Sequence, residues 1–483
     1  MVAPLPPPVH GSAMMTQYIK DSQIINQALD LDWVNLSTSR KMDEIGKTTP
    51  AKLWRFVSSY AKTFFKMLTH RYDACYFAIT CHGMGFLKDA PFVLMAKLLS
   101  RGRIIIHQHN KGMQHDVDRP VFKWLLPMVY RNSEVILLSW RLYPDIERVV
   151  KREQVHICPN GIPETIVYPK RKEPHIPQIL FLSNLIESKG VLVLLDACKI
   201  LKEEGYLFNC KFIGGETKEI DSNRFEEEVS KRGLNKSVIY AGKKYGADKD
   251  SEFAESDMFV FPTFYGNETF GLVLLEAMQQ STPVVSTDVG GIPDFVQHEQ
   301  NGLICTQQDA KDLASKMARL LKSPEFAQKL GEEGRKTFLE KYTIEKWEEI
   351  LLTDIQNVIW GGKYVTYLGK KFGEEKSRLI AESDIFVFPT FYENECFPLV
   401  LLEAMQQKVP VISTTEGGIP DIIIDGQTGL LTAPKDAYDL AEKIKRVLSF
   451  STELSLNGHN HYKRNFTIEL FVDTMLSIIK NTQ

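Results

Sequence analysis

The sequence predicts an α/β protein with two doubly wound domains and part of a third. Short apolar segments rich in β-branched residues alternate with amphipathic segments, both in the first third of the chain and from residue 178 onward. Strands that are apolar throughout and separated by single helices are typical of parallel sheets covered on both faces. A segment of the second domain also recurs near the C-terminus, which predicts an appended half-domain.

The composition is that of an ordinary globular protein. Its 483 residues are 43% hydrophobic and 25% charged, enough for two or three domains with cores of their own. The seven cysteines form no C-x-x-C pair, so we expect reduced thiols in a cytoplasmic protein. No apolar run approaches the ~20 residues of a membrane-spanning helix, and we expect no signal peptide.

Positive charge is concentrated in the N-terminal domain. Residues 1–165 hold 21 Lys and Arg against 14 Asp and Glu, whereas the whole chain has a net charge of −3. This balance suits an anionic partner such as the inner face of a membrane, although a mildly basic domain is often simply soluble. Segment 52–70 combines a helical apolar stripe with basic residues, so it is either packed on the domain core or placed at a membrane surface. We expect no nucleic acid as a partner.

The first domain is expected to span residues 1–165. Its predicted strands lie within residues 75–80, 102–109, 134–139 and 154–162. Segment 163–177 is rich in proline and charge and lacks helical periodicity, so it is the expected hinge to the next domain.

The second domain is expected to span residues 166–359. Its predicted strands are the apolar segments "QILFLSNL", "FNCKFIGG", "SVIYAGKK", "MFVFPTF", "PVVSTD" and "LICTQ". Amphipathic helices separate them, and a long helical tail follows from about residue 309.

Residues 360–483 are expected to form the half-domain. Residues 238–306 align with 365–433 without a gap at a shift of 127, and 32 of 41 positions are identical between 254–294 and 381–421. We interpret this repeat as a tandem duplication. The second copy has no counterpart of residues 178–237, so it holds only the latter half of a doubly wound domain.

The segment "NETFGLVLLEAM" (267–278) contains two glutamates, Glu268 and Glu276, in an apolar sequence. An ionised Glu276 inside an apolar helix costs several kcal/mol unless it is compensated, so we expect it to face a ligand or a donor. Glu268 directly precedes the helix, whose free amides at 270–273 can receive a phosphate. The alternative is that Glu268 caps the helix and Glu276 is a salt-bridged helix residue.

Several motifs together resemble family-4 retaining glycosyltransferases. Segment 259–296, with an E-x7-E motif, a P-V-V strand and a G-G turn, resembles the donor-site block of that family. Segments 181–197, 158–162 and 4–15 are similar to the start of its donor domain, the end of its N-terminal domain and its glycine-bearing first loop. The resemblance implies a GT-B fold, with two Rossmann-like domains facing across a cleft, and a reaction that needs no metal and no other cofactor.

The resemblance also assigns roles to residues of the donor site. Lys189 would bind the donor phosphates, Glu268 would contact the sugar hydroxyls and Glu276 would hold the ribose hydroxyls. The remaining donor-site positions are Asn184, the amides of Gly271, Leu272 and Val273, near the diphosphate, and Gly11 in the first loop.

A histidine at the end of a strand is the other candidate for catalysis. In "HQHNKG", His109 (or His107) resembles the histidine that reaches toward the sugar and the acceptor, although a strand-end histidine can also simply bond a loop. Spacing supplies no third ligand for a metal at this H-x-H pair. We take Glu268 and His109 as the catalytic residues and assign no nucleophile.

The chain departs from the family pattern in three places. Asn184 stands where the family has an arginine, five residues before Lys189, so the donor site would hold one positive charge fewer. The start "MVAPLPPP" leaves the hydrophobic first strand of the first domain largely missing, which would expose its neighbours. In the second copy, Pro398 replaces Gly271 and removes one backbone donor.

The first copy of the repeat follows the Lys189 half-domain in the expected order. It should therefore complete the second sheet, and Glu395 and Glu403 of the second copy would be relics or the core of an appended module.

We expect a glycosyltransferase that moves a sugar from a UDP- or GDP-linked donor to a glycan or lipid-linked acceptor with retention, in surface polysaccharide synthesis. One alternative is a catalytically impaired nucleotide-sugar-binding or scaffolding protein. An epimerase acting on a nucleotide sugar in the same fold is another.

Overall fold

The computed structural model describes residues 1–7, 11–39, 49–165, 175–360, 366, 368–392 and 395–481. The chain separates into two compact units, Met1–Tyr367 and Leu368–Gln483. The expected hinge, 163–177, lies for the most part outside the described residues. The domain limits at 165 and 359 remain predictions.

The first domain is built on a six-stranded sheet with the order β2-β1-β3-β4-β5-β6, in which every pair is parallel. Its strands are β1 (Val2–Ala3), β2 (Val34–Asn35), β3 (Ala74–Phe77), β4 (Arg103–Gln108), β5 (Glu134–Leu137) and β6 (Val155–Ile157). The last three lie inside segments predicted as strands, and β3 overlaps the predicted segment 75–80 but begins one residue earlier. The first strand, expected to be largely missing, is present in two residues and pairs with both β2 and β3.

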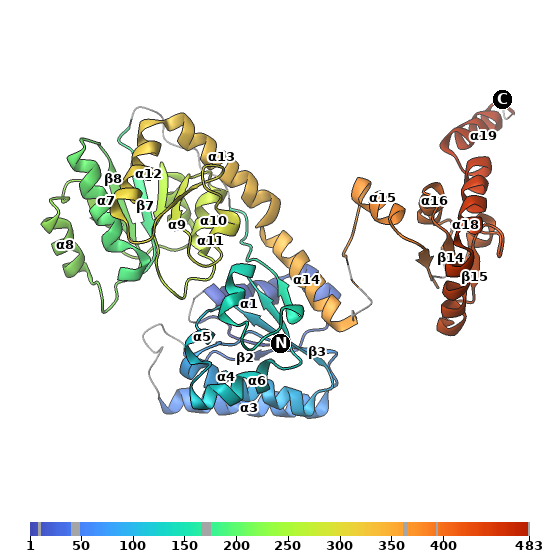
Figure 1. Ribbon diagram of the computed structural model, residues 1–483, viewed down its shortest axis with the longest axis horizontal. Coiled ribbons are helices and arrows are strands. Elements are labelled where there is room, and N and C mark those ends of the chain that lie inside the picture. The colour runs from blue at the N-terminus through green and yellow to red at the C-terminus, as the bar shows by residue number, and fades with distance from the viewer. Residues whose placement is uncertain are drawn as a thin grey trace. The chain divides into compact units, whose positions relative to one another are not determined.

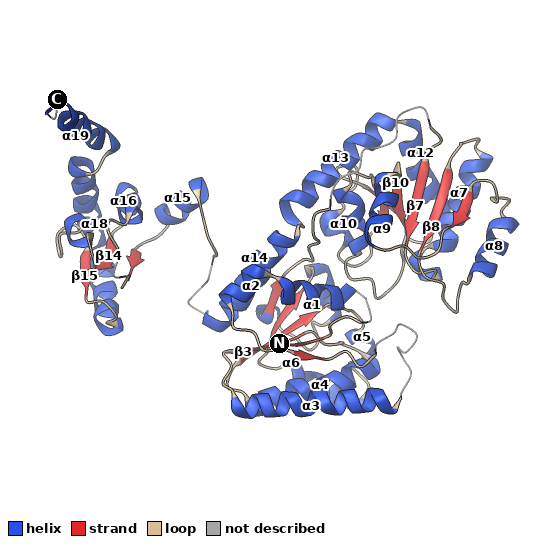
Figure 2. Ribbon diagram, turned by 180° about the vertical axis from the view of Figure 1, so that it is seen from behind, coloured by secondary structure: helices blue, strands red, loops and turns tan. Residues whose placement is uncertain are grey.

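Helices cover both faces of this sheet (Figures 1 and 2). Alternate strand residues point to opposite sides, so that Ile104 and Ile106 join one apolar core and Ile105 joins another. The helices of the domain are α1 (Gly11–Asp21), α2 (Gln23–Ala28), α3 (Pro50–Thr69), α4 (Gly83–Leu99), α5 (Met113–Asp116) and α6 (Pro120–Tyr130), with 3-10 turns η2 (Trp140–Asp145) and η3 (Arg152–Gln154).

The second domain has a parallel sheet with the order β12-β11-β10-β7-β8-β9. Counted from β7, this is the 3-2-1-4-5-6 order of a Rossmann-like domain. The strands are β7 (Gln178–Leu182), β8 (Asn209–Ile213), β9 (Val238–Tyr240), β10 (Met258–Phe261), β11 (Val284–Thr287) and β12 (Leu303–Cys305). The helices are η4 (Glu187–Lys189), α7 (Val191–Glu203), α8 (Ser222–Lys231), α9 (Gly246–Ala254), α10 (Leu272–Gln279), α11 (Ile292–Phe295), α12 (Ala310–Lys322) and α13 (Pro324–Lys341).

The next helix, α14 (Ile344–Trp360), returns to the first domain. Trp347 is fully buried in the core that also contains Ile105 and Cys158. At the start of the helix, a bridge pairs Thr343 with Ile162, and a Cβ on Gly161 would lie 2.4 Å from the Thr343 carbonyl oxygen. Helix α14 therefore completes the core of the N-terminal domain, although it follows the second domain in the sequence.

The unit 368–483 contains a three-stranded parallel sheet, β13-β14-β15. Phe386 of β13 pairs with Val411 of β14, as Phe259 pairs with Val284 at the same positions of the first copy. In the first copy, β10 also pairs with β7, whereas β13 pairs with β14 alone among the described strands. The elements are α15 (Gly373–Ala381), β13 (Phe386–Phe388), α16 (Leu399–Gln406), β14 (Val411–Thr414), α17 (Ile419–Ile422), β15 (Leu430–Thr432), α18 (Ala437–Asn465) and α19 (Ile468–Asn481).

The first copy of the repeat completes the Rossmann-like sheet, as the chain order predicts. Met258 and Phe259 of β10 pair with Ile179 and Leu180 of β7. The second copy folds as half a sheet.

We predict that Asp354→Asn in α14 stabilises the protein at pH 8 and not at pH 4. Burial raises the pKa of Asp354 to about 6, against an opposing effect of His156, and one of its carboxylate oxygens has no hydrogen-bond partner within the described part of the chain. Because the folded pKa exceeds the unfolded one, ionisation disfavours the folded state as pH rises from about 4 to 6. Thermal unfolding at both pH values should show a gain of about 1–2 kcal/mol at pH 8 only. The exposed Glu349→Gln on the same helix is the control, and an equal gain for Asp354→Asn at pH 4 would contradict the explanation.

Candidate functional site

A cavity of about 610 Å³ lies between the two domains of the first unit. Its first-domain wall includes Gly11 and Tyr18 of α1, and its second-domain wall includes residues that follow β7 and β10. These two strands are neighbours at the point where the strand order reverses, which is where open α/β sheets bind ligands. Gly11 lies next to Leu272 of the second domain. A Cβ on Gly11 would lie 3.8 Å from the Leu272 Cδ1 atom, at van der Waals contact.

Lys189 and Glu268 meet in this cavity. Lys189 ends the turn after β7, and its Nζ lies 2.5 Å from Oε2 of Glu268, which follows β10. The ammonium also lies 4.5 Å from the ring centroid of Tyr265, within range of a cation–π interaction. Both charged side chains are largely buried, so the pair places a cation and an anion in a partly dehydrated cavity.

Gly190 allows this approach. Its φ is +90°, and a Cβ there would lie 2.3 Å from the carbonyl oxygen of Pro262, in the loop after β10. A residue with a side chain would separate the two loops, so glycine is required both by conformation and by space.

Glu276 lies in the same cavity, on the cavity-facing side of α10. Its Oε1 lies 2.7 Å from Nζ of Lys249 in α9, and its Oε2 is buried without a hydrogen-bond partner among the described residues. Burial raises the pKa of Glu276, while the charge of Lys249 lowers it. A carboxylate oxygen that is buried, unsatisfied and next to a cavity is suited to accept hydrogen bonds from a ligand.

The N-terminus of α10 also faces the cavity. Gly271 is its N-cap with φ of +78°, and Leu272 and Val273 begin the helix. The free amides of such a start favour a bound anion. Gly290 packs beneath this segment, because a Cβ there would lie 2.3 Å from the Glu268 carbonyl oxygen.

The two candidate histidines have different surroundings. His107 is fully buried in β4, its Nδ1 lies 2.7 Å from the Tyr76 hydroxyl, and burial holds its pKa well below the usual range. His109 lines the cavity, and its carbonyl accepts a hydrogen bond from the Thr269 hydroxyl of the second domain. His109 is therefore placed to meet a ligand, and His107 is a core residue.

Asn184 is the predicted donor-site residue that the structure does not bring into the cavity. Its Oδ1 accepts a hydrogen bond from the Gly215 amide at 3.2 Å, and it is absent from the cavity wall, where Ser183 stands instead. The assignment of Asn184 to the donor site remains a prediction. Its short amide side chain bonds the neighbouring loop of its own domain.

Two segments of the chain match one family description. Residues 167–337 and, separately, residues 345–449 match families described as "Glycosyl transferases group 1", and together these matches cover more than half of the chain. Each of these two segments is therefore similar to group 1 glycosyl transferases.

Curated relatives resemble part of this chain. The amylovoran biosynthesis glycosyltransferase AmsK of Erwinia amylovora is 29% identical over 202 residues, which is 40% of this chain and 49% of the relative. The putative colanic acid biosynthesis glycosyltransferase WcaL of Escherichia coli is 30% identical over 173 residues, 35% and 42% of the two chains. The chain spans about half the length of the curated relatives it matches.

Solved structures share the fold of this chain. Sucrose-phosphate synthase from Thermosynechococcus elongatus has a TM-score of 0.52 at 21% identity, over 68% of this chain and 80% of its own. Anabaena HepE in complex with UDP has a TM-score of 0.53 at 16% identity, over 62% and 82%. These likenesses and the two parallel sheets show an α/β GT-B fold with two Rossmann-like domains.

The second copy of the group 1 segment repeats part of the site in an open form. Glu403 pairs with Lys376 at 2.7 Å, as Glu276 pairs with Lys249, but the Glu403 side chain is 38% exposed against 18% for Glu276. Glu395 keeps its position above a glycine turn, since a Cβ on Gly417 would clash with the Glu395 carbonyl oxygen. Pro398 forms the N-cap of α16 where Gly271 caps α10.

Lys249 and Tyr18 are among the residues of the cavity wall that were not predicted from the sequence. Lys249 could have been found, because the matching lysine, Lys376, recurs in the second copy at the same shift of 127. Tyr18 lies across the cavity from Glu276, whose charge, after burial, raises the tyrosine pKa. No sequence pattern distinguishes Tyr18 from the other apolar residues of α1.

We predict that Glu276→Ala weakens binding of UDP or GDP by about 10- to 100-fold, the loss expected when hydrogen bonds to a buried carboxylate are removed. Glu403→Ala is the matched control, because it removes the same residue from the same kind of lysine pair in the second copy. Isothermal titration of both variants is the measurement. The reverse result would show that the second copy binds the nucleotide.

Proposed function

We propose that the protein transfers a sugar from a UDP- or GDP-linked donor to a glycan or lipid-linked acceptor, with retention and without a metal ion. The observation that carries this proposal is the cavity in which Lys189, Glu268, Glu276 and the start of α10 meet. The structure of Anabaena HepE with UDP supports a nucleotide donor. The names of the amylovoran and colanic acid relatives support a role in surface polysaccharide synthesis.

The donor's three chemical parts fit three features of the cavity. The unsatisfied Oε2 of Glu276 would accept hydrogen bonds from the ribose hydroxyls. Lys189 and the amides of Leu272 and Val273 would stabilise the negative charge that develops on the departing diphosphate, as a metal does elsewhere. When phosphate engages Lys189, Glu268 is released from its ion pair and can accept hydrogen bonds from the sugar.

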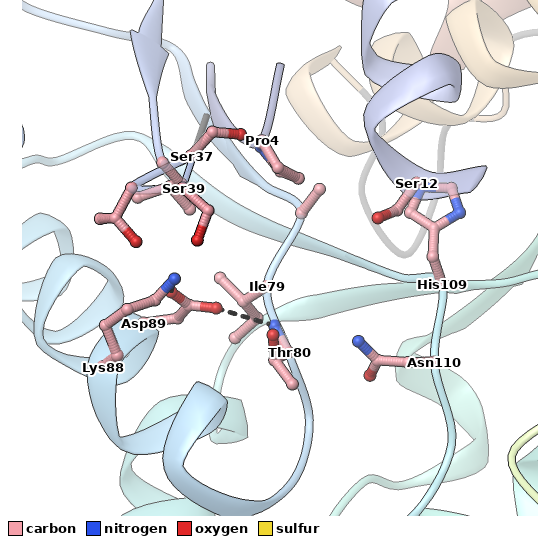
Figure 3. Close-up of a pocket in the computed structure, with 13 residues that line it drawn as sticks. Pro4, Ser12, Ser37, Ser39, Ile79, Thr80, Lys88, Asp89, His109 and Asn110 are labelled. Carbon is pink, nitrogen blue, oxygen red and sulfur yellow. Dashed lines mark hydrogen bonds and ion pairs between the residues drawn. The ribbon is translucent and has the colours of Figure 1, made fainter. Parts of the chain in front are cut away.

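The acceptor would enter from a second cavity, of about 230 Å³, in the first domain (Figure 3). The two cavities share Ser12 and His109, so a group held in the second cavity borders the site of transfer. Hydroxyl, amide and charged side chains surround the second cavity, including Ser37, Ser39 and Asn110. Such a wall suits a polyhydroxylated sugar acceptor.

Asp89 is the buried carboxylate of this acceptor cavity. Its Oδ2 accepts a hydrogen bond from the Thr80 amide at 3.0 Å, drawn in Figure 3, and its Oδ1 lies 3.2 Å from Nζ of Lys88. Burial raises the pKa of Asp89. We propose that Asp89 orients an acceptor hydroxyl, with His109 beside the reacting sugar.

Calorimetric titration with UDP, GDP and their sugars, followed by a donor-hydrolysis assay, tests the function. Binding with slow hydrolysis supports the transferase, and the anomeric configuration of the product by NMR tests retention. Binding without turnover with any acceptor supports a catalytically impaired nucleotide-sugar-binding protein. No binding of either nucleotide would count against both functions.

We predict that Asp89→Asn raises the KM for a glycan acceptor by about tenfold, because a charge-assisted hydrogen bond to a hydroxyl is lost. Donor affinity should stay unchanged, since Asp89 lies outside the donor cavity. Asp116→Asn is the control: Asp116 is buried in the same domain and bonds the Gly83 amide, but it lines neither cavity. A weaker donor affinity for Asp89→Asn would contradict this assignment.

A further inference from the structure

Helices α3, α4 and α6 form one layer on a face of the first sheet, where Figure 1 shows them side by side. Large apolar side chains stand on the solvent side of this layer. Trp54 of α3 is 72% exposed, Leu98 of α4 is 84% exposed and Trp124 of α6 is 76% exposed. Further exposed apolar residues of the layer are Leu53, Val57, Phe65, Leu68, Val121 and Met128. We call this surface the outer face.

The outer face belongs to helices that carry basic residues and almost no acidic ones. Neither α3 nor α6 contains an Asp or a Glu, and the single acid of α4, Asp89, is buried. The three helices carry the basic residues Lys52, Arg55, Lys62, Lys66, Lys88, Lys97 and Lys123. Apolar side chains are therefore exposed in a positive field.

A basic cavity of about 380 Å³ lies where α4 and α6 end. Lys97, Arg101, Arg103 and Arg131 line it, together with Glu134, whose carboxylate bonds His156. Burial and the charge of Arg131 lower the pKa of Lys97 to about 8. Four cations around one cavity repel each other, so an anion bound there would relieve the repulsion.

The charge and the hydrophobicity of the outer face together indicate which kind of partner it binds. A second copy of the same face would bring like charges together, which disfavours self-association. Aromatic and aliphatic side chains beside lysines and arginines are the features of helices that lie in the interface of an anionic bilayer. Among the described helices none is long and apolar enough to cross a membrane. We therefore expect the outer face to lie on the membrane surface.

We propose that the outer face docks on an anionic lipid bilayer, with Trp54, Leu98 and Trp124 entering the headgroup region and lipid phosphates reaching the Lys97–Arg101–Arg131 cavity. The proposal rests on the surface alone and stands whether or not the cavity between the domains binds a nucleotide. It also gives the basic N-terminal domain a partner.

Sedimentation of the full chain with vesicles tests this docking. The protein should bind vesicles of equal parts phosphatidylcholine and phosphatidylglycerol, bind phosphatidylcholine alone far more weakly, and dissociate as salt is raised. The double variant Trp54→Ala and Trp124→Ala should bind about tenfold or more weakly. Phe372→Ala, which removes an aromatic side chain of 76% exposure from the second unit, should leave binding unchanged.

A second variant tests the charge independently. Lys62→Glu with Lys123→Glu should reduce binding to the anionic vesicles by about fivefold or more for each charge and leave nucleotide titration as in the wild type. Absence of binding to the anionic vesicles overturns the proposal. So does equal binding to both vesicle types, or binding that survives both pairs of substitutions.

Discussion

The parallel pairing of β7 with β10 brings the second-domain side of the cavity together. The two strands are neighbours in space, but about 75 residues separate them along the chain, and the strand order reverses between them. Lys189 follows one strand and Glu268 the other, so the sheet holds the two charges at contact distance. Gly190 keeps their loops together, and its position is fixed by the Pro262 carbonyl rather than by any ligand.

The second domain holds charged groups in the cavity whose hydrogen-bonding capacity is not fully met by the described residues. Glu276 has one oxygen paired with Lys249 and one without a partner among the described residues. A partly satisfied buried charge lowers stability, and it is retained where a ligand completes the bonding. The equivalent pair of the second copy, Glu403 with Lys376, is more exposed to water and lacks a counterpart of the Lys189 segment. The same helix sequence therefore lines a cavity in the first copy and carries a more exposed glutamate in the second.

Sequence patterns anticipated the regular parts of the fold and three charged residues of the cavity, Lys189, Glu268 and Glu276, but not Lys249. Long β-branched runs such as those of β4 and β7 identify buried parallel strands without further information, and the E-x7-E spacing located Glu268 and Glu276. The two-residue strands β1 and β2 are too short to show any periodicity. Asn184 was assigned to the donor site because it occupies the position of the family's arginine. In the structure its short amide side chain bonds its own loop and does not line the cavity. Tyr18 comes from the other domain, and its approach to Glu276 depends on how two sheets pack, which no local pattern encodes.

Among the described strands, β13 pairs on one side only, whereas β10 pairs on both. The order in which the chain is synthesised bears on this difference. Residues of β10 leave the ribosome 127 positions before those of β13, an interval on the order of ten seconds at ordinary rates of synthesis. Residues of β10 can pair with β7 before β13 has been synthesised, and that edge of β7 is then occupied when β13 appears. The order of synthesis would therefore favour pairing of β7 with β10 even if β10 and β13 had the same affinity for β7.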